Sequence, residues 1–466
     1  MPNPQNNDQY YVSTRGTAPR AGFADILLAG LAPDGGLYLP EAWPQPSAAD
    51  LRRRTDYVGV ATEILVRFAA GSFSREEIAA DVAAAYAGFD DPAIVPLKTL
   101  APGLHLLELF HGPTLAFKDL ALQVLGRLFA RALQRRGGRA TVVVATSGDT
   151  GSAAIAALGG LPNIDIFVLH PRGRVSEVQR RQMTTSACAN VHNIALEGTF
   201  DDAQSLVKAL FADTEFAHAV SLTAVNSINF ARIAAQAVYY FTASRIGGNN
   251  VFVVPTGNFG DVFAGEAAMR MGLGIEKLVI ATNANDILAR ALNDGVYARG
   301  EVHASLSPSM DIQVASNFER ALFEASNRDA KWLNQAMTAF ARDGRLVIPP
   351  PVLASLRARY AAFACDDALT IQTMARVKRD FGEIVDPHTA VAFAAALPWW
   401  KPKERDVIVL STAHPAKFPD AVAQATGATP PVPARLKGLF DVAERLEILP
   451  NDKALVRAHI ESKLGL

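Results

Sequence analysis

Short apolar runs alternate along the chain, from about residue 140 onward, with longer stretches in which apolar residues recur at helical spacing. This alternation is typical of βαβ units that form a largely parallel sheet. We therefore predict an α/β fold with strands at 141–146, 164–169, 190–196, 251–255, 277–282 and 406–410. Ligands bind beyond the carboxyl ends of the strands in open sheets of this kind, so the loops after the strands are examined first.

The first hundred residues have a different pattern. They are rich in alanine and arginine, contain turn signals at 33–36 and 44–46, and lack strong strand runs. We therefore expect a mainly helical domain that precedes the α/β part of the chain.

Several helices carry their own boundary signals. Ser or Thr followed three residues later by an acidic residue is typical of a capping box, and Asp before Pro is typical of an N-cap. We therefore expect helices to begin after Thr199, Ser316 and Asp386. Glycine just past a helical pattern indicates a helix end. We expect such ends near Gly247, Gly248 and Gly272.

Length and charge narrow the class of protein. A chain of 466 residues suggests about three folding units. Its 45 basic and 46 acidic side chains give a formal net charge of −1, which leaves no strong field to hold nucleic acid or an anionic membrane. No segment approaches the ~18 apolar residues that a membrane-spanning helix needs. We therefore expect a small molecule as partner, with no nucleic acid and no membrane.

Cysteine content and missing motifs exclude further classes. Cys188 and Cys365 are too few for a disulfide framework or a zinc cluster, and the polar amino terminus lacks the apolar stretch of a signal peptide. We therefore expect a cytoplasmic enzyme without a bound metal. The sequence contains no complete GxGxxG, no GK dipeptide, no GxSxG and no HExxH. Their absence argues against a dehydrogenase, a P-loop ATPase, a hydrolase triad and a zinc site.

One loop suits a phosphate group. The segment PTGNFGD (255–261) follows a predicted strand and precedes a helical pattern, so its backbone N–H groups and the helix dipole favour an anion there. The residues expected at that helix start are Gly257, Asn258, Phe259 and Gly260. Asp261 would compete with the anion unless its carboxylate faces away. A tight β-to-α turn without a ligand explains the glycines about equally well.

A second loop, TSGDTGSAA (146–154), also lies between a predicted strand and a predicted helix. It offers the short polar side chains of Ser147, Asp149, Thr150 and Ser152 beside two glycines. Such a set suits a carboxylate or an anionic ring oxygen. An ordinary helix cap explains the loop nearly as well, but two such loops in one sheet favour a ligand site.

Lys118 is the most reactive candidate. It opens an apolar helical pattern with leucines at 122, 125 and 128, and it lies between Phe117 and Leu120. Apolar neighbours and the helix dipole both favour the neutral amine, as a Schiff-base lysine requires. The alternative is a surface lysine whose stem covers apolar area. With the two loops, Lys118 completes a set of residues that could hold pyridoxal phosphate.

Nine segments in order carry a resemblance to a known family. They are YVSTRG (11–16), LAPDGGLYLPE (31–41), FHGPTLAFKD (110–119), ATSGDTGSAA (145–154), NSINFARI (226–233), VPTGNFGD (254–261), ATNANDIL (281–288), SPSMDIQVASNFERALFE (307–324) and STAHPAKFP (411–419). Across almost the whole chain these segments resemble threonine synthase, in particular the group with an extended amino-terminal domain. Phe230 is a departure, since tryptophan is common there in this family, and it affects the expected shape of the pocket.

The resemblance implies the fold of the tryptophan synthase β subunit, in which two open, mostly parallel α/β lobes enclose pyridoxal phosphate. We place the mainly helical amino-terminal domain at 1–97, the larger lobe at 98–135 and 225–466, and the smaller lobe at 136–224. The resemblance also implies Lys118 as the Schiff-base lysine, residues 257–260 around the cofactor phosphate, and a neutral hydroxyl at the pyridine nitrogen, from Thr412. The loop of Ser147, Gly148, Asp149 and Thr150 would receive the substrate carboxylate and flank the cofactor ring oxygen.

The activity implied by the resemblance converts O-phospho-L-homoserine and water to L-threonine and phosphate, by γ-elimination followed by β-addition of water. Candidates for holding the substrate phosphate are Arg15, Arg320, His414 and Lys417. A surface or interdomain ion pair explains each of these four about as well. A phospho-lyase that releases 2-oxobutyrate and ammonia, and a non-catalytic binding protein, remain as alternatives. We expect a monomer or a small homo-oligomer.

Overall fold

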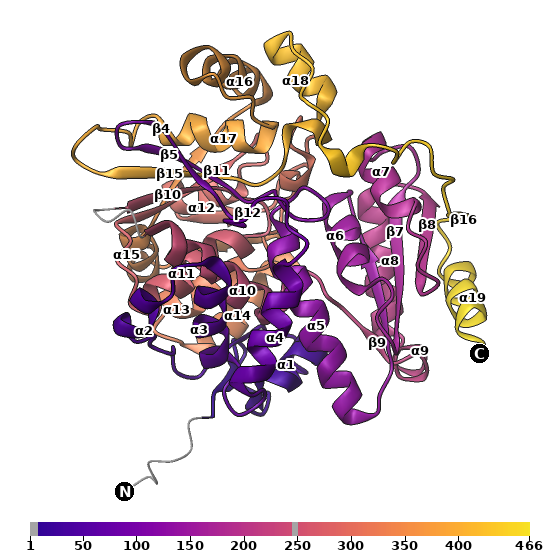
Figure 1. Ribbon diagram of the computed structural model, residues 1–466. Helices are drawn as coiled ribbons and strands as arrows, with labels where there is room; N and C mark the ends of the chain where they lie inside the picture. The colour runs from indigo at the N-terminus through magenta and orange to yellow at the C-terminus, as the bar shows by residue number, and fades with distance from the viewer. Residues whose placement is uncertain (1–7, 245–249) are drawn as a thin grey trace, which may run out of the picture.

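Two sheets of mostly parallel strands lie at the centre of the protein, whose computed structural model describes residues 8–244 and 250–466 (Figure 1). The larger sheet has the strand order β14-β11-β10-β15-β5-β4, and its edge strand β4 runs antiparallel to β5. Its strands are β4 (Leu97–Ala101), β5 (Leu104–Glu108), β10 (Asn250–Pro255), β11 (Lys277–Thr282), β14 (Tyr360–Ala364) and β15 (Asp406–Ser411).

The smaller sheet has the order β16-β8-β7-β6-β9 and is parallel throughout its described strands. These are β6 (Ala140–Ala145), β7 (Ile164–Pro171), β8 (Val191–Glu197), β9 (Leu222–Thr223) and β16 (Glu447–Pro450). The helices of this smaller lobe are α6 (Asp149–Leu158), α7 (Glu177–Thr184), α8 (Phe200–Ala212), α9 (Thr214–Ala219) and α19 (Lys453–Leu464). The α/β fold with two lobes is confirmed.

All six strands predicted from apolar runs are present, because both faces of each sheet are covered. In β10, Phe252 packs in the core formed with α10 (Phe230–Ala243) and α11 (Gly260–Arg270). Its neighbour Val253 packs on the opposite face, in the core formed with α17 (Pro387–Ala396). A strand buried on both faces reads as one continuous apolar run, which is the pattern that predicted it.

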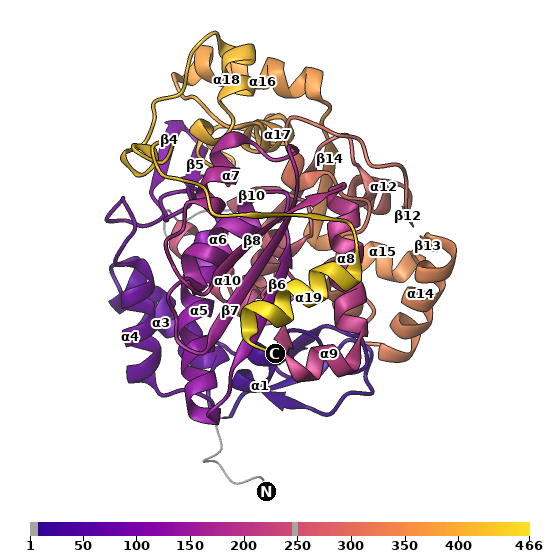
Figure 2. The same ribbon diagram turned by 90° about the vertical axis from the view of Figure 1, so that its right-hand side faces the viewer.

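The end of the chain returns to the smaller lobe. After α18 (Pro419–Thr426) the chain crosses between the lobes, β16 pairs with β8, and the yellow α19 packs beside α8 (Figure 2). The predicted larger lobe, 225–466, is therefore too long at its carboxyl end. Strand β16 has four residues and is mostly exposed, so it gives no apolar run that a sequence search could detect.

The amino-terminal region contains both helices and a small sheet. Its helices are α1 (Phe23–Ala29), α2 (Ala48–Arg53), α3 (Tyr57–Phe68) and α4 (Arg75–Tyr86). A three-stranded antiparallel sheet of β1 (Tyr10–Ser13), β2 (Ala21–Gly22) and β3 (Tyr38–Pro40) was not expected. Strands of two to four residues are too short to show a two-residue period. Helix α3 packs against α10, and α4 packs against α5 (Lys118–Arg136) of the larger lobe.

Phe230 belongs to this interdomain core. Its ring lies 5.2 Å from that of Tyr11, 5.5 Å from that of Phe68 and 6.2 Å from that of Trp43, centroid to centroid. The departure from the family pattern at this position therefore affects packing of the amino-terminal region, and the expectation that it shapes the ligand pocket is corrected.

The helix boundary signals have mixed outcomes. Thr199 forms the predicted capping box at α8, and Asp386 caps α17 through the N–H groups of residues 388 and 389. Gly272 follows α11 with a positive φ of 95°. The capping box predicted at Ser316 is wrong, because Glu319 binds Thr14 and Arg15 instead. Gly247 and Gly248 lie outside the described residues.

The remaining elements extend the larger lobe. They are α12 (Ile287–Asp294), β12 (Val296–Ala298), α13 (Phe318–Ala325), α14 (Ala330–Asp343), β13 (Arg345–Val347), α15 (Pro350–Arg359) and α16 (Asp367–Phe381). Among the residues that the structure describes, no helix has the length and apolar character needed to cross a membrane.

Candidate active site

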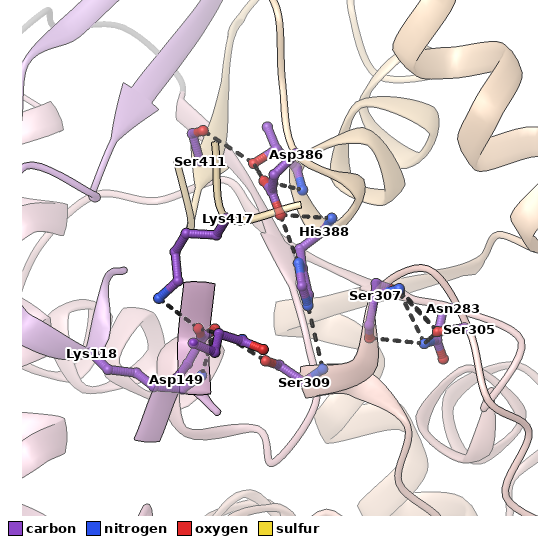
Figure 3. Close-up of polar contacts among 12 residues, drawn as sticks. Lys118, Asp149, Asn283, Ser305, Ser307, Ser309, Asp386, His388, Ser411 and Lys417 are labelled. Carbon is purple, nitrogen blue, oxygen red and sulfur yellow. Dashed lines mark hydrogen bonds and ion pairs between the residues drawn. The ribbon is translucent and has the colours of Figure 1, made fainter. Parts of the chain in front are cut away.

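The candidate residues meet where loops at the carboxyl ends of strands in the two sheets face each other (Figure 3). Lys118 begins α5 after the loop that follows β5, and the neighbouring Phe117 N–H donates to the carbonyl of Thr412, just after β15. Residues 257–260 link β10 to α11. Asp149 begins α6 after β6 of the smaller lobe. Strand ends that are distant in sequence therefore form one site.

Lys118 is buried, with 8% of its surface exposed, which excludes the alternative of a surface lysine. Its Nζ lies 3.3 Å from Oδ2 of Asp149. Burial lowers the pKa of Lys118, the nearby Lys417 and Arg232 lower it further, and Asp149 acts in the opposite direction. The pKa of Lys118 is therefore shifted toward easier formation of the neutral amine, which is the direction that the sequence predicted.

Asp149 accepts hydrogen bonds from four residues. Its Oδ1 lies 2.7 Å from Nζ of Lys417 and 2.8 Å from Nε2 of Gln179, while Oδ2 accepts from Lys118 and from the Ser309 hydroxyl at 3.2 Å. Burial opposes ionisation, but the two ammonium groups hold the pKa of Asp149 well below its usual range. Asp149 is therefore an ionised acceptor that joins the lobes, and it cannot bind an anion itself.

Lys417 is fully buried between Asp149 and the carbonyl of Thr114, which accepts from its Nζ at 2.9 Å. A cavity of about 230 Å³ opens beside this cluster between the lobes. Its lining includes Ser147 and Gln179 of the smaller lobe and Pro308 and Lys417 of the larger lobe. Lys417 therefore reaches the predicted substrate region, although Asp149 already neutralises its charge.

The phosphate loop leaves the start of α11 open. Phe259 adopts a left-handed conformation with φ 65°, and no side chain caps the helix. A Cβ on Gly257 would lie 2.6 Å from the carbonyl oxygen of Ser309, so this position requires glycine. The backbone N–H and the side chain of Asn317 both donate to the carbonyl of Asn258 and hold the loop.

Asp261 does not occupy that helix start. Its Oδ1 accepts from the hydroxyl of Tyr239 at 2.5 Å and from that of Tyr240 at 3.0 Å, both on α10. Burial raises the pKa of Asp261 to about 7. Hydrogen bonds to α10 therefore hold the Asp261 carboxylate away from the helix start, where it would otherwise compete with an anion.

Arg232 is a site residue that the sequence analysis missed. It lies in the first turn of α10 with 3% of its surface exposed, and among the described residues no carboxylate pairs with it and its Nε has no partner. Burial lowers its pKa to about 10. A buried cation without a counter-charge is costly, so this arginine requires an anion. The signal was available, since Arg232 interrupts an otherwise apolar helical stretch.

Two of the predicted phosphate-binding residues face elsewhere. Arg15 forms a bidentate ion pair with Glu319, at 2.7 and 2.9 Å. Arg320 is fully buried and donates to the carbonyls of Tyr38 and Ile228 and to Asn317. Both arginines join the amino-terminal region to the larger lobe, so the prediction that they hold a substrate phosphate is corrected.

His414 is not a cation. Burial lowers its pKa to about 4, and its Nδ1 accepts from the N–H of Ala416. The neutral ring can therefore donate from Nε2 only, and the expected cationic role is corrected. Thr412 is buried, and its carbonyl accepts from the N–H of Phe117, the residue before Lys118. Gly148 has φ 134°, and Thr150 lies in the first turn of α6.

Family models match three parts of the chain: threonine synthase N terminus (10–86), pyridoxal-phosphate dependent enzyme (92–412) and threonine synthase C-terminal (389–460). A threonine synthase from Pseudomonas aeruginosa is 47% identical, with 97% of each chain covered. The crystal structure of a pyridoxal-phosphate-bound threonine synthase from Brucella melitensis is 48% identical, with a TM-score of 0.94 and coverage of 98% of this chain and 99% of that one. The chain belongs to the threonine synthase family.

A threonine synthase from yeast has a similar structure, with 38% identity, a TM-score of 0.93 and 99% of each chain covered. The protein is therefore a pyridoxal-phosphate enzyme of the tryptophan synthase β-like fold that acts on a small molecule. The site fits this cofactor: Lys118 is a buried amine, Gly257 leaves room at an uncapped helix start, and Arg232 lacks a counter-charge. In the described part of the chain, no cluster of three or more His, Cys, Asp or Glu side chains could hold a metal.

Proposed function

We propose that this member of the threonine synthase family converts O-phospho-L-homoserine and water to L-threonine and phosphate, by γ-elimination followed by β-addition of water. The observation that carries the proposal is the buried amine of Lys118 beside the ionised Asp149, together with the uncompensated Arg232. Relatives named threonine synthase that align over nearly the whole chain support it.

Pyridoxal phosphate, when bound, supplies the electron sink that acidifies the protons next to the substrate amino group. Lys118 would hold the cofactor covalently, and the backbone N–H groups of Gly257, Asn258, Phe259 and Gly260 would hold its phosphate. Thr412 directly follows β15, its carbonyl accepts from the N–H of Phe117, and its hydroxyl would face the ring nitrogen. A neutral hydroxyl there leaves the nitrogen unprotonated.

Lys118 is the residue that moves protons. The reaction needs two protons removed from substrate carbons, one at Cα and one at Cβ, and two returned, one to Cγ and one to Cα, and a single mobile base serves these steps. Burial and the neighbouring cations lower the pKa of the Lys118 amine, so its neutral form is easier to reach than that of a free lysine. Asp149 accepts from its Nζ and limits the directions in which the amine can point. We therefore assign base and acid roles to Lys118 and an orienting role to Asp149.

Arg232 would provide the positive charge for the leaving phosphate. The reaction involves two phosphate groups, and the uncapped start of α11 accommodates that of the cofactor. Arg232 lies close enough to lower the pKa of Lys118, and its charge is unpaired. Guanidinium groups suit phosphate because they donate two parallel hydrogen bonds. In this proposal Lys417 holds Asp149 in place, and Ser147, Gly148 and Thr150 receive the substrate carboxylate.

Product analysis tests the proposal. Purified holoenzyme is incubated with O-phospho-L-homoserine, and threonine, 2-oxobutyrate and phosphate are measured together. We expect threonine and phosphate in equal amounts, with little 2-oxobutyrate. Predominant 2-oxobutyrate with ammonia would identify a phospho-lyase that uses the same Lys118. Absence of turnover, together with unchanged visible absorbance in Lys118→Ala, would identify a binding protein instead.

We also propose a cytoplasmic enzyme that works as a monomer or small homo-oligomer, without a nucleic-acid or membrane partner. The formal net charge of −1 and the free thiols of Cys188 and Cys365 support this proposal. Size-exclusion chromatography coupled to light scattering gives the oligomeric state. Cell fractionation gives the compartment, and recovery in a membrane fraction would contradict the proposal.

A further inference from the structure

Ser309 connects three parts of the site. It lies in a short 3₁₀ helix (Pro308–Met310) after β12. Its N–H donates to Nε2 of His388 at 3.4 Å, and its hydroxyl donates to Oδ2 of Asp149 at 3.2 Å (Figure 3). Its carbonyl oxygen lies against Gly257 of the phosphate loop. The position of this one residue therefore affects both the phosphate loop and the carboxylate beside Lys118.

His388 is held rigidly behind Ser309. Its Nδ1 lies 2.6 Å from Oδ2 of Asp386, which is itself fully buried and caps α17. Its ring packs against that of Phe418, with centroids 5.0 Å apart. Because Nε2 accepts from Ser309, the ring proton lies on Nδ1 and is donated to Asp386. The imidazole thus presents a fixed acceptor to the backbone of Ser309.

We propose that His388, oriented by Asp386, is a positioning residue that fixes Ser309 so that the Ser309 hydroxyl and the Lys118 amine share one oxygen of Asp149. The geometry is specific, since both groups donate to Oδ2, while Lys417 and Gln179 donate to Oδ1. His388 reaches no reacting atom in this arrangement and acts only through Ser309.

The shared oxygen has an electrostatic consequence. A hydroxyl donor at Oδ2 takes up part of the carboxylate charge, so Asp149 stabilises a proton on the Lys118 nitrogen less strongly. The other charged groups that face Lys118 are the cations Lys417 and Arg232, which act in the same direction as the hydroxyl. The charged groups that face His388 are Asp386, Asp149 and Asp311. Without the Ser309 hydroxyl, the Asp149 carboxylate therefore stabilises a proton on the Lys118 nitrogen more strongly.

Titration of the holoenzyme without substrate tests the proposal. The visible absorbance of the cofactor linked to Lys118 is followed against pH, and the midpoint reports protonation of the linked nitrogen. For Ser309→Ala we expect the midpoint to rise by about 0.5–1 pH unit, which is the size of the net contribution of one typical hydrogen bond. Because no substrate is present, the result does not depend on which product the enzyme makes.

Two variants of His388 separate its two contacts. His388→Asn retains a donor for Asp386 but is too short to accept from Ser309, whereas His388→Gln places an oxygen near the position of Nε2. We expect His388→Asn to raise the midpoint as Ser309→Ala does. We expect His388→Gln to titrate with the same midpoint as the parent enzyme. The matched control is His105→Asn, since His105 also pairs with an aspartate, Asp406, but lies on β5 away from Ser309.

Three results would overturn the proposal. The first is a titration midpoint in Ser309→Ala that equals that of the parent enzyme. This result would overturn the proposal even when a His388 variant fails to fold. The second is an equal shift in His388→Asn and His388→Gln, which would mean that the acceptor for Ser309 is unimportant. The third is a similar shift in His105→Asn, which would indicate a general effect of disrupting an Asp–His pair.

Discussion

Replacing Arg232 with methionine gives a sharp test of the site, because the two expected effects have opposite signs. Burial lowers the pKa of Arg232 to about 10, and this shift corresponds to roughly 3 kcal/mol of unfavourable free energy for the charged form in the fold. Methionine fills a similar volume without the charge. We therefore expect substrate-free Arg232→Met to be more stable than the parent by about 1–3 kcal/mol.

The same replacement should weaken the reaction. The leaving phosphate loses its charged partner, so we expect kcat/KM for O-phospho-L-homoserine to fall by roughly 100-fold, as for the loss of a strong charge-assisted contact. Thermal unfolding of the holoenzyme and phosphate release under initial-rate conditions measure the two effects separately.

Arg320→Met is the matched control for the stability effect. Arg320 is equally buried, but its donors are used by backbone carbonyls, including that of Tyr38. Removing it leaves buried carbonyl oxygens without a donor, so this variant should be less stable than the parent. Destabilisation of Arg232→Met with unchanged kcat/KM would refute the reasoning. Weaker cofactor binding with an unchanged KM for O-phospho-L-homoserine would show that Arg232 binds the cofactor phosphate and not the substrate phosphate.

Further predictions concern the phosphate loop and the ring nitrogen. Gly257→Ala forces a Cβ to within 2.6 Å of the Ser309 carbonyl, so equilibrium dialysis should show at least tenfold weaker cofactor binding, while Gly274→Ala, with no atom within 4 Å, should match the parent. Asp261 has a pKa raised to about 7, so it contributes stability at low pH that is lost as pH rises through 7. Denaturant unfolding should therefore show Asp261→Asn more stable than the parent by about 1–3 kcal/mol at pH 8, with little difference at pH 4. Thr412→Asp should protonate the ring nitrogen and increase the 2-oxobutyrate fraction, and an unchanged product ratio would contradict the contact.

The parts of the fold that the sequence predicts are those with a strong local pattern. The six predicted strands are buried on both faces, so each appears as an apolar run, and Lys118 was found because it opens an apolar helical pattern. The amino-terminal sheet and β16 were missed because strands of two to four residues show no period.

The errors at the site have a different origin. Arg320 and Glu319 lie in a segment typical of the family, but each has a partner in the amino-terminal region, and Glu319 is 305 residues from Thr14. Asp149 and Ser309 are 160 residues apart in the chain. Local sequence does not show which distant group a charged side chain will meet. It therefore identified Asp149 and Lys417 as site residues without revealing that they neutralise each other.

The return of the chain end to the smaller lobe has a consequence for biosynthesis. Strand β8 has β7 on one side and β16 on the other, so until residues 447–450 are made, one edge of β8 presents unpaired N–H and C=O groups. Such an edge is a template for pairing with another chain. Strands β6 to β8 are translated well before β16, so one side of this sheet stays open until residues 447–450 have been made. Protection of this edge from aggregation during synthesis therefore depends on a segment about 250 residues further along the chain.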